Sequence, residues 1–211
     1  ISSSVPSNNY AHYNNGTLTL KNYSYEGVGV YDADGEGCYD GINANGDLYI
    51  NLIGDNSITL AANYASYGIT CYGTLTICGN SSSSSDSLTL FGTTSAGIFA
   101  GKVNIFNNCA VGIFSTGDGI YSFGDIFVED SLLYSVSENE YYDERYSSIH
   151  LADGANFVAS SQLAIFASKT PNEDGGDLVQ YDADCIKDYD YILATIPAPV
   201  LIGGTLLNDG E

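Results

Sequence analysis

Residues 41–50 read GINANGDLYI, and close variants of this phrase recur along the chain. They are GITCYGTLTI at 68–77, GIFAGKVNI at 97–105 and GIYSFGDIFV at 119–128, with a degenerate copy that starts at Ser148 and continues through 157–159. Successive copies start 27, 29, 22 and 29 residues apart. A repeat at this spacing is typical of proteins that stack one small structural unit on the next.

Each copy follows one pattern, in which Gly-Ile-x-small precedes a glycine turn and then x-apolar-x-apolar. Apolar residues at a period of two indicate β-strands. A further strand-like segment follows several copies, at 57–60, 87–90 and 131–134. Two or three short strands per repeat make up one coil of a parallel β-helix. We therefore predict an all-β, single-domain parallel β-helix (a solenoid) over 1–170, with about five to six coils of 22–29 residues. Residues 171–211 are predicted to cap it or to lead into a following module.

Stacked coils share one core, so residues at the same place in each copy should lie above one another. The first predicted interior ladder contains Ile42, Ile69, Ile98, Ile120 and Ile149. The second contains Leu48, Leu75, Val103 and Ile126, and the third contains Ile50, Ile77, Ile105 and Val128. A fourth place requires a small buried side chain and is held by Ala44, Cys71, Ala100 and Ser122. Cys78 follows the last ladder residue of its copy and is expected at a turn or facing outward.

The charge of the chain excludes two classes of partner. It has 26 Asp and Glu residues against 5 Lys and Arg, for a formal net charge of −21. Five cations cannot build the basic patch that nucleic-acid binding requires, and they do not favour docking on anionic lipid. The chain also contains no apolar run of the roughly 18 residues that a membrane-spanning helix needs. We therefore expect neither nucleic-acid binding nor membrane insertion.

The repeat resembles that of a known group of proteins. Residues 41–54, GINANGDLYINLIG, resemble a GIYAxGDLTINLxG phrase found in secreted β-helix repeat proteins of gut clostridia and ruminococci, which are often labelled carbohydrate-binding or adhesin-like. NGTLTLKN at 15–22 is similar to the strand before the first such repeat, and the resemblance covers roughly residues 14–168. It implies a β-helix that is extracellular or attached to the cell wall, as a module of a larger surface protein. It brings no catalytic motif.

An acidic loop is a candidate calcium site. Asp32, Asp34, Glu36 and Asp40 lie in the segment YDADGEGCYD at 31–40. Alternating carboxylates followed by glycine are typical of a calcium-binding loop. Position 12 of such a loop would be Asn43 rather than the glutamate that an EF-hand requires, so we predict at most a loop site with these four carboxylates as ligands. The alternative is a solvated acidic loop at a corner of a coil.

Tyrosine is the other candidate binding residue, with 18 copies in the chain. Sugars stack on aromatic rings while their hydroxyls bond to polar side chains. The predicted ligand-binding residues are Tyr49, Tyr72, Tyr121, Tyr141 and Tyr142. The alternative is that tyrosine pads the outer faces of the strands, as its β-propensity favours.

Three functions are compatible with this sequence. The first is an extracellular, surface-displayed module for adhesion that binds a glycan or a surface protein. The second is a structural stalk without a ligand. The third is a polysaccharide lyase or glycoside hydrolase, for which two carboxylates about 5–9.5 Å apart are needed. Asp40 and Asp118 both precede a Gly-Ile pair, but we expect them more than one coil apart, which disfavours the enzyme.

Overall fold

A computed structural model describes residues 8–32, 37–61, 64–80, 86–138, 146–171, 178–196, 200–202 and 205–207. The first of two large sheets contains β1 (Tyr10–Asn14), β2 (Thr17–Lys21), β4 (Val30–Tyr31), β5 (Tyr39–Ala44), β6 (Leu48–Ile53), β8 (Ser66–Gly79), β10 (Ala96–Phe106), β12 (Asp118–Ser122), β13 (Ile126–Val128), β15 (Ile149–Leu151) and β16 (Phe157–Ala159). The second contains β3 (Ser24–Gly27), β7 (Asp55–Leu60), β9 (Asp86–Thr93), β11 (Cys109–Ser115), β14 (Leu132–Ser137), β17 (Ala164–Ser168), β18 (Leu178–Gln180) and β19 (Tyr191–Thr195). The all-β prediction is confirmed.

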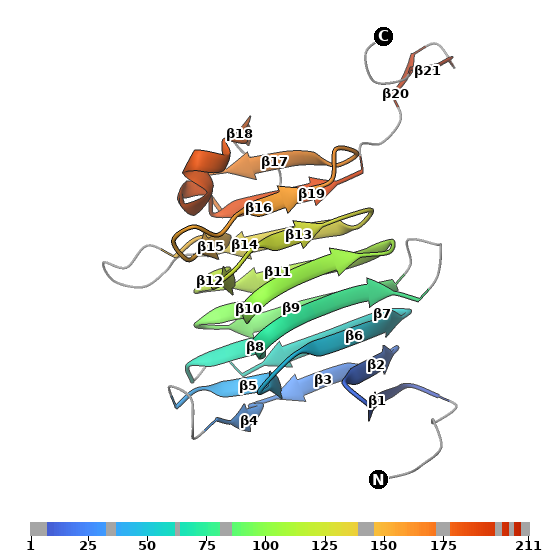
Figure 1. Ribbon diagram of the computed structural model, residues 1–211, viewed down its shortest axis with the longest axis vertical. Helices are drawn as coiled ribbons and strands as arrows, with labels where there is room; N and C mark the ends of the chain where they lie inside the picture. The colour runs from blue at the N-terminus through green and yellow to red at the C-terminus, as the bar shows by residue number, and fades with distance from the viewer. Residues whose placement is uncertain are drawn as a thin grey trace.

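The chain passes back and forth between the two sheets and advances by one strand position each time. The first sheet follows the order β1-β2-β6-β8-β10-β12-β15, and the central strands of the second follow β14-β11-β9-β7-β3. Pairing is parallel from β2 to β15 in the first sheet and from β3 to β14 in the second. Figure 1 shows the strands stacked along the long axis of the molecule.

The four predicted ladders are confirmed by the strand register. Ile69 pairs with Ile42 on one side and with Ile98 on the other, and the row continues through Ile120 to Ile149. The second and third ladders run through Leu75 and Ile77 of β8 in the same way. Cys71 lies between Ala44 and Ala100 and is fully buried, so it is a small core residue as predicted. Burial of these ladders supplies the main favourable term for the fold.

Glycine and aspartate hold the bend that divides the strands of the first sheet. A Cβ on Gly73 would lie 2.6 Å from the backbone nitrogen of Asp47, so the bend requires glycine there. Asp47 Oδ1 accepts a hydrogen bond from the backbone N–H of Thr74 at 2.7 Å, and Asp125 Oδ1 accepts one from Asn156 at 2.8 Å. In the two copies that contain Gly-Asp, the aspartate therefore ties the bend to the next strand of the stack.

A second corner is held by buried polar side chains. Asn56 Oδ1 accepts from the N–H of Tyr23 at 2.9 Å. Asp86 accepts from Gly54 and from Asn80, at 2.8 and 2.9 Å. These contacts satisfy backbone donors that the turns between the two sheets would otherwise leave buried and unbonded, which is costly.

Antiparallel strands lie at both ends of the stack. At the N-terminal end, β1 pairs with β2. At the other end, β19 lies between β14 and β17 and is antiparallel to both, and the short 3-10 helix η1 (Ala183–Asp188) packs near β15. Residues 191–195 therefore belong to the second sheet. β20 (Val200–Ile202) and β21 (Thr205–Leu207) form a separate hairpin. No helix among the described residues is long and apolar enough to cross a membrane.

The first ladder provides a test of the packing. Ile98 is fully buried between Ile69 and Ile120, and Ile98→Ala should lower the free energy of unfolding by about 2–5 kcal/mol, because it leaves a cavity within the stack. Ile196→Ala is the matched control, since Ile196 is exposed, and should change stability by less than about 0.5 kcal/mol. Urea unfolding measures both values. Equal effects of the two substitutions would contradict the ladder.

Candidate functional site

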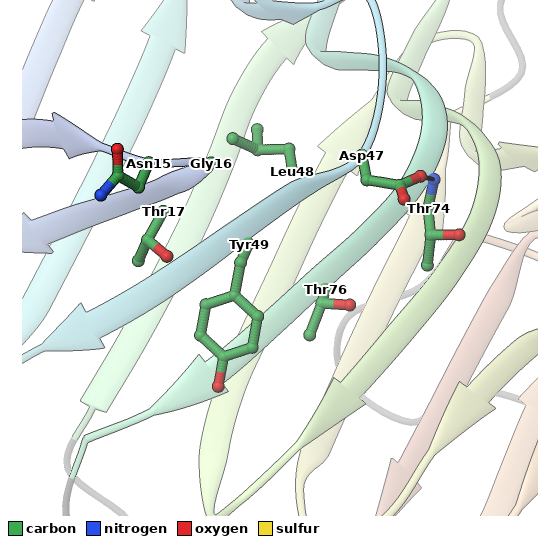
Figure 2. A pocket seen from close by; sticks show the side chains of 8 residues that line it. All are labelled: Asn15, Gly16, Thr17, Asp47, Leu48, Tyr49, Thr74 and Thr76. Atoms are coloured by element: carbon green, nitrogen blue, oxygen red, sulfur yellow. Dashed lines mark hydrogen bonds between the residues drawn. The ribbon is translucent and has the colours of Figure 1, made fainter.

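A hollow of about 500 Å³ opens on the outer side of the first sheet, where Tyr49 lies. Figure 2 shows Tyr49 between Thr17 and Thr76, with Asp47 and Thr74 at the adjacent bend. The complete lining consists of Asn15, Gly16, Thr17, Asp47, Leu48, Tyr49, Thr74 and Thr76. Apart from Gly16 and Leu48, every one of these residues has a polar group in its side chain.

The strand register assembles this hollow. Thr17 of β2, Tyr49 of β6 and Thr76 of β8 occupy one row, because Tyr49 pairs with both threonines. Their neighbours along the strands, such as Ile50 and Ile77, point into the core, so the row itself must point outward. Asn15 and Gly16 form the turn between β1 and β2 with positive φ angles, and this turn borders the hollow.

Tyr49 is held in place by Cys78 on the neighbouring strand. The Cys78 thiol donates to the Tyr49 hydroxyl, with Sγ and Oη 2.8 Å apart. The ring therefore leans across the sheet over Cys78, and 37% of Tyr49 stays exposed. Burial, together with the Cys78 contact, raises the pKa of Tyr49 to about 12, so the hydroxyl remains protonated near neutral pH. A ring held this way loses little side-chain freedom when a ligand binds.

The expectation for Cys78 is met in one of its two forms. It was predicted at a turn or facing outward, and it faces outward, but within β8 rather than at a turn, and it is only 2% exposed. The alternation of the strand does direct its side chain away from the core, opposite Asn51 and Phe106. The Tyr49 ring then covers the thiol, and this contact between neighbouring strands is not visible in the local sequence.

Tyr121 belongs to a row of rings that stack on one another. Phe99 of β10, Tyr121 of β12 and His150 of β15 are in register. The Tyr121 ring lies 5.4 Å from Phe99 at an interplanar angle of 23°, and 4.6 Å from His150. Both of its faces are thus occupied by protein rings. Phe123 adds a third ring contact at 5.2 Å and 66°, so the packing agrees with the alternative that Tyr121 covers the outer face of the sheet.

Tyr72 lies at the border of the same cluster and is 48% exposed. Its ring meets Phe99 edge to face at 6.2 Å and 80°. Its hydroxyl donates to Asp32 Oδ2 at 3.3 Å. Phe123, which is 54% exposed, makes the equivalent edge contact with Phe99 at 5.3 Å and 89°. Sequence reasoning missed Phe99 and Phe123, although Phe99 shares its place in the repeat with Tyr121 and His150.

The acidic loop is described in part. Asp32 Oδ2 and Asp40 Oδ2 both accept from the Asn43 side-chain amide, so two of the four predicted calcium ligands lie close together. Asp34 and Glu36 are outside the described residues, as are the predicted binding residues Tyr141 and Tyr142. Within the described part of the chain, no group of three His, Cys, Asp or Glu side chains is arranged to hold a metal ion. The calcium loop stays a prediction.

The carboxylate pair considered for hydrolysis is widely separated. Asp40 pairs with Tyr67, Tyr67 with Ala96, and Ala96 with Asp118. Three strand spacings put their Cα atoms about 14 Å apart, beyond the 9.5 Å that glycoside hydrolysis tolerates. Asp118 is also engaged by Ser147 N–H at 2.9 Å and by His150 Nδ1 at 3.3 Å. This pair therefore does not form a hydrolytic centre.

A comparison of the chain with protein-family models, with curated proteins and with solved structures found no match.

Asp40 provides a test of the electrostatics beside the acidic loop. Burial raises the pKa of Asp40 above its ordinary value of 3.8, against the lowering effect of hydrogen bonds from Asn43 and Thr70. A raised pKa means that the folded state keeps the proton longer, so ionisation of Asp40 costs stability as the pH rises through the raised value. Asp40→Asn removes this cost. Its advantage in unfolding free energy over the natural chain should therefore grow from pH 3.5 to pH 7.

Urea unfolding across this pH range measures the difference. The control is Asp153→Asn, a substitution at a fully exposed side chain. A flat profile for Asp40→Asn would contradict the raised pKa.

Proposed function

We propose that this chain is a parallel β-helix that is displayed outside the cell, on the cell surface or wall, and binds a neutral glycan for adhesion. The parallel register, the alternation between two sheets and the glycine bends within the first sheet support this architecture. The resemblance of the repeat to secreted β-helix proteins supports the location and a place within a larger surface protein.

The hollow at Tyr49 is the observation that carries the binding proposal. It combines one tethered aromatic ring with three threonine hydroxyls, an asparagine amide and an aspartate. Sugars present a weakly polar face and a rim of hydroxyls, and such a site offers a partner to each. The chain's charge of −21 disfavours acidic polysaccharides by repulsion, so neutral glycans fit best.

The other functions have less support. A surface-protein partner fits the charge but not the small size of the hollow, since stable protein interfaces bury about 800 Å² on each partner. A ligand-free stalk has no need for the exposed Tyr49 ring beside an open polar hollow. A polysaccharide lyase or glycoside hydrolase needs a catalytic pair, and the pair considered, Asp40 and Asp118, is too far apart.

Glycan binding is tested with an array of neutral plant and mucin oligosaccharides, followed by titration calorimetry of the best ligand. Tyr49→Ala should weaken binding at least about tenfold, because it removes the stacking surface. Tyr49→Phe keeps the ring and should weaken binding by less than about threefold. The control Phe91→Ala removes a ring of similar exposure from the second sheet and should have no effect.

Two results would refute the proposal. One is an array without any neutral ligand. The other is a ligand whose affinity falls equally in the Tyr49→Ala and Phe91→Ala variants. Circular dichroism of each variant shows that a loss of binding is not a loss of folding.

A further inference from the structure

We infer that the glycan bound at Tyr49 is a chain of at least two sugars, and that its next unit occupies a second hollow beside Tyr13. This inference rests on the proposed function, because the second hollow extends the one at Tyr49. It defines the ligand as an oligosaccharide rather than a single terminal sugar.

The second hollow, of about 560 Å³, adjoins the first at the N-terminal end of the stack. Its lining includes Asp47 and Leu48, which also line the Tyr49 hollow, so the two hollows meet at the bend before β6. Each volume lies within the range of about 300–1,000 Å³ that is typical of small-molecule sites. Together the two hollows have room for more than one sugar ring.

The β1–β2 hairpin positions Tyr13 in the second hollow. Tyr13 pairs with Leu18, and Leu18 pairs with the fully buried Ile50, so Tyr13 lies on the core side of the sheet. Among the described strands none lies beyond β1 in the sheet order, and Tyr13 is therefore 63% exposed. The tip of the hairpin is held in place, because the Gly16 carbonyl accepts from the N–H of Tyr49 at 3.0 Å.

The second hollow offers the same two kinds of contact as the first. Leu18 and Ile42 are half-buried against the end of the core and add apolar surface to that of the Tyr13 ring. The exposed side chains of Asn45 and Asp47 supply hydrogen-bonding groups. A second sugar therefore finds apolar partners for its ring face and polar partners for its hydroxyls.

Asp47 lies where the two hollows meet. Its Oδ1 accepts from the N–H of Thr74 at 2.7 Å, which fixes the carboxylate at the bend. Among the described residues no other hydrogen bond is made to Asp47, so Oδ2 can accept hydroxyls from the sugars on either side of the bend.

One sugar ring cannot contact both tyrosines. Tyr49 shares the outward row with Thr17, whereas Tyr13 lies with Leu18 on the opposite side of the sheet. A ligand that contacts both rings must therefore pass around the bend at Asp47, and only an oligosaccharide is long enough to do so.

The test compares chain lengths. Neutral oligosaccharides of one to four units, from the maltose, cellulose and mannan series, are titrated into the full chain and followed by NMR. In a series that binds, the tetrasaccharide should bind at least about tenfold more tightly than the monosaccharide, because it fills both hollows. If the array identifies a neutral ligand outside these series, its own fragments of one to four units take their place.

Two variants separate the hollows. Tyr13→Ala should weaken tetrasaccharide binding at least about fivefold and leave monosaccharide binding within about twofold, since its ring contacts only the added unit. Tyr49→Ala should weaken the binding of both. The matched control is Tyr64→Ala, because Tyr64 is 51% exposed and lines neither hollow, and it should change neither affinity.

Equal affinities for the monosaccharide and the tetrasaccharide, or full tetrasaccharide binding by Tyr13→Ala, would overturn this inference. Binding that still depends on Tyr49 would then leave the proposed function in place. The absence of any neutral ligand would overturn both proposals. If Tyr13→Ala does not fold, the comparison of chain lengths on the natural chain decides by itself.

Discussion

The stacking of one inward isoleucine on the next is the interaction on which the rest of the structure depends. No strand of the stack can bury its apolar side without the strands above and below it. A slip of one residue would turn Ile69 outward and Thr70 inward, so burial fixes the register. The same register also sets which side chains are neighbours on the outer surface. Because Ile50 pairs with Ile77, the preceding residue Tyr49 lies beside Thr76, and Thr17 is its neighbour on the other side.

Several polar residues stabilise this stack of strands through hydrogen bonds at its bends and corners. Asp47 and Asp125 tie the bends, and Asn56 and Asp86 satisfy donors at the second corner. Part of the acidity is therefore structural, since Asp47 and Asp125 bond backbone N–H groups at the bends and Asp86 is buried at the second corner. The outward residues Thr17, Tyr49 and Thr76 make none of these contacts, and they line the hollow on the outer side of the first sheet.

The sequence predicted the core better than the surface. The Gly-Ile repeat was enough to align the four ladders residue by residue. Every second residue of a strand must be buried and like residues must stack on like, and only one register of the strands meets both conditions. It did not reveal that Cys78 would be covered by Tyr49, since that contact joins residues 29 positions apart. Thr17, Thr74 and Thr76 were missed for the same reason: a binding surface depends on neighbours across strands. Phe99 could have been found by reading the outward place of each repeat as a column.

Crystallisation of the chain with a bound neutral oligosaccharide tests the central claim most directly, because one electron-density map shows both the register and the ligand. The account predicts Ile98 between Ile69 and Ile120, with a sugar ring against the exposed face of Tyr49 and hydroxyls near Thr17 and Thr76. A map in which the isoleucines are out of register, or in which the sugar lies away from Tyr49, would contradict it.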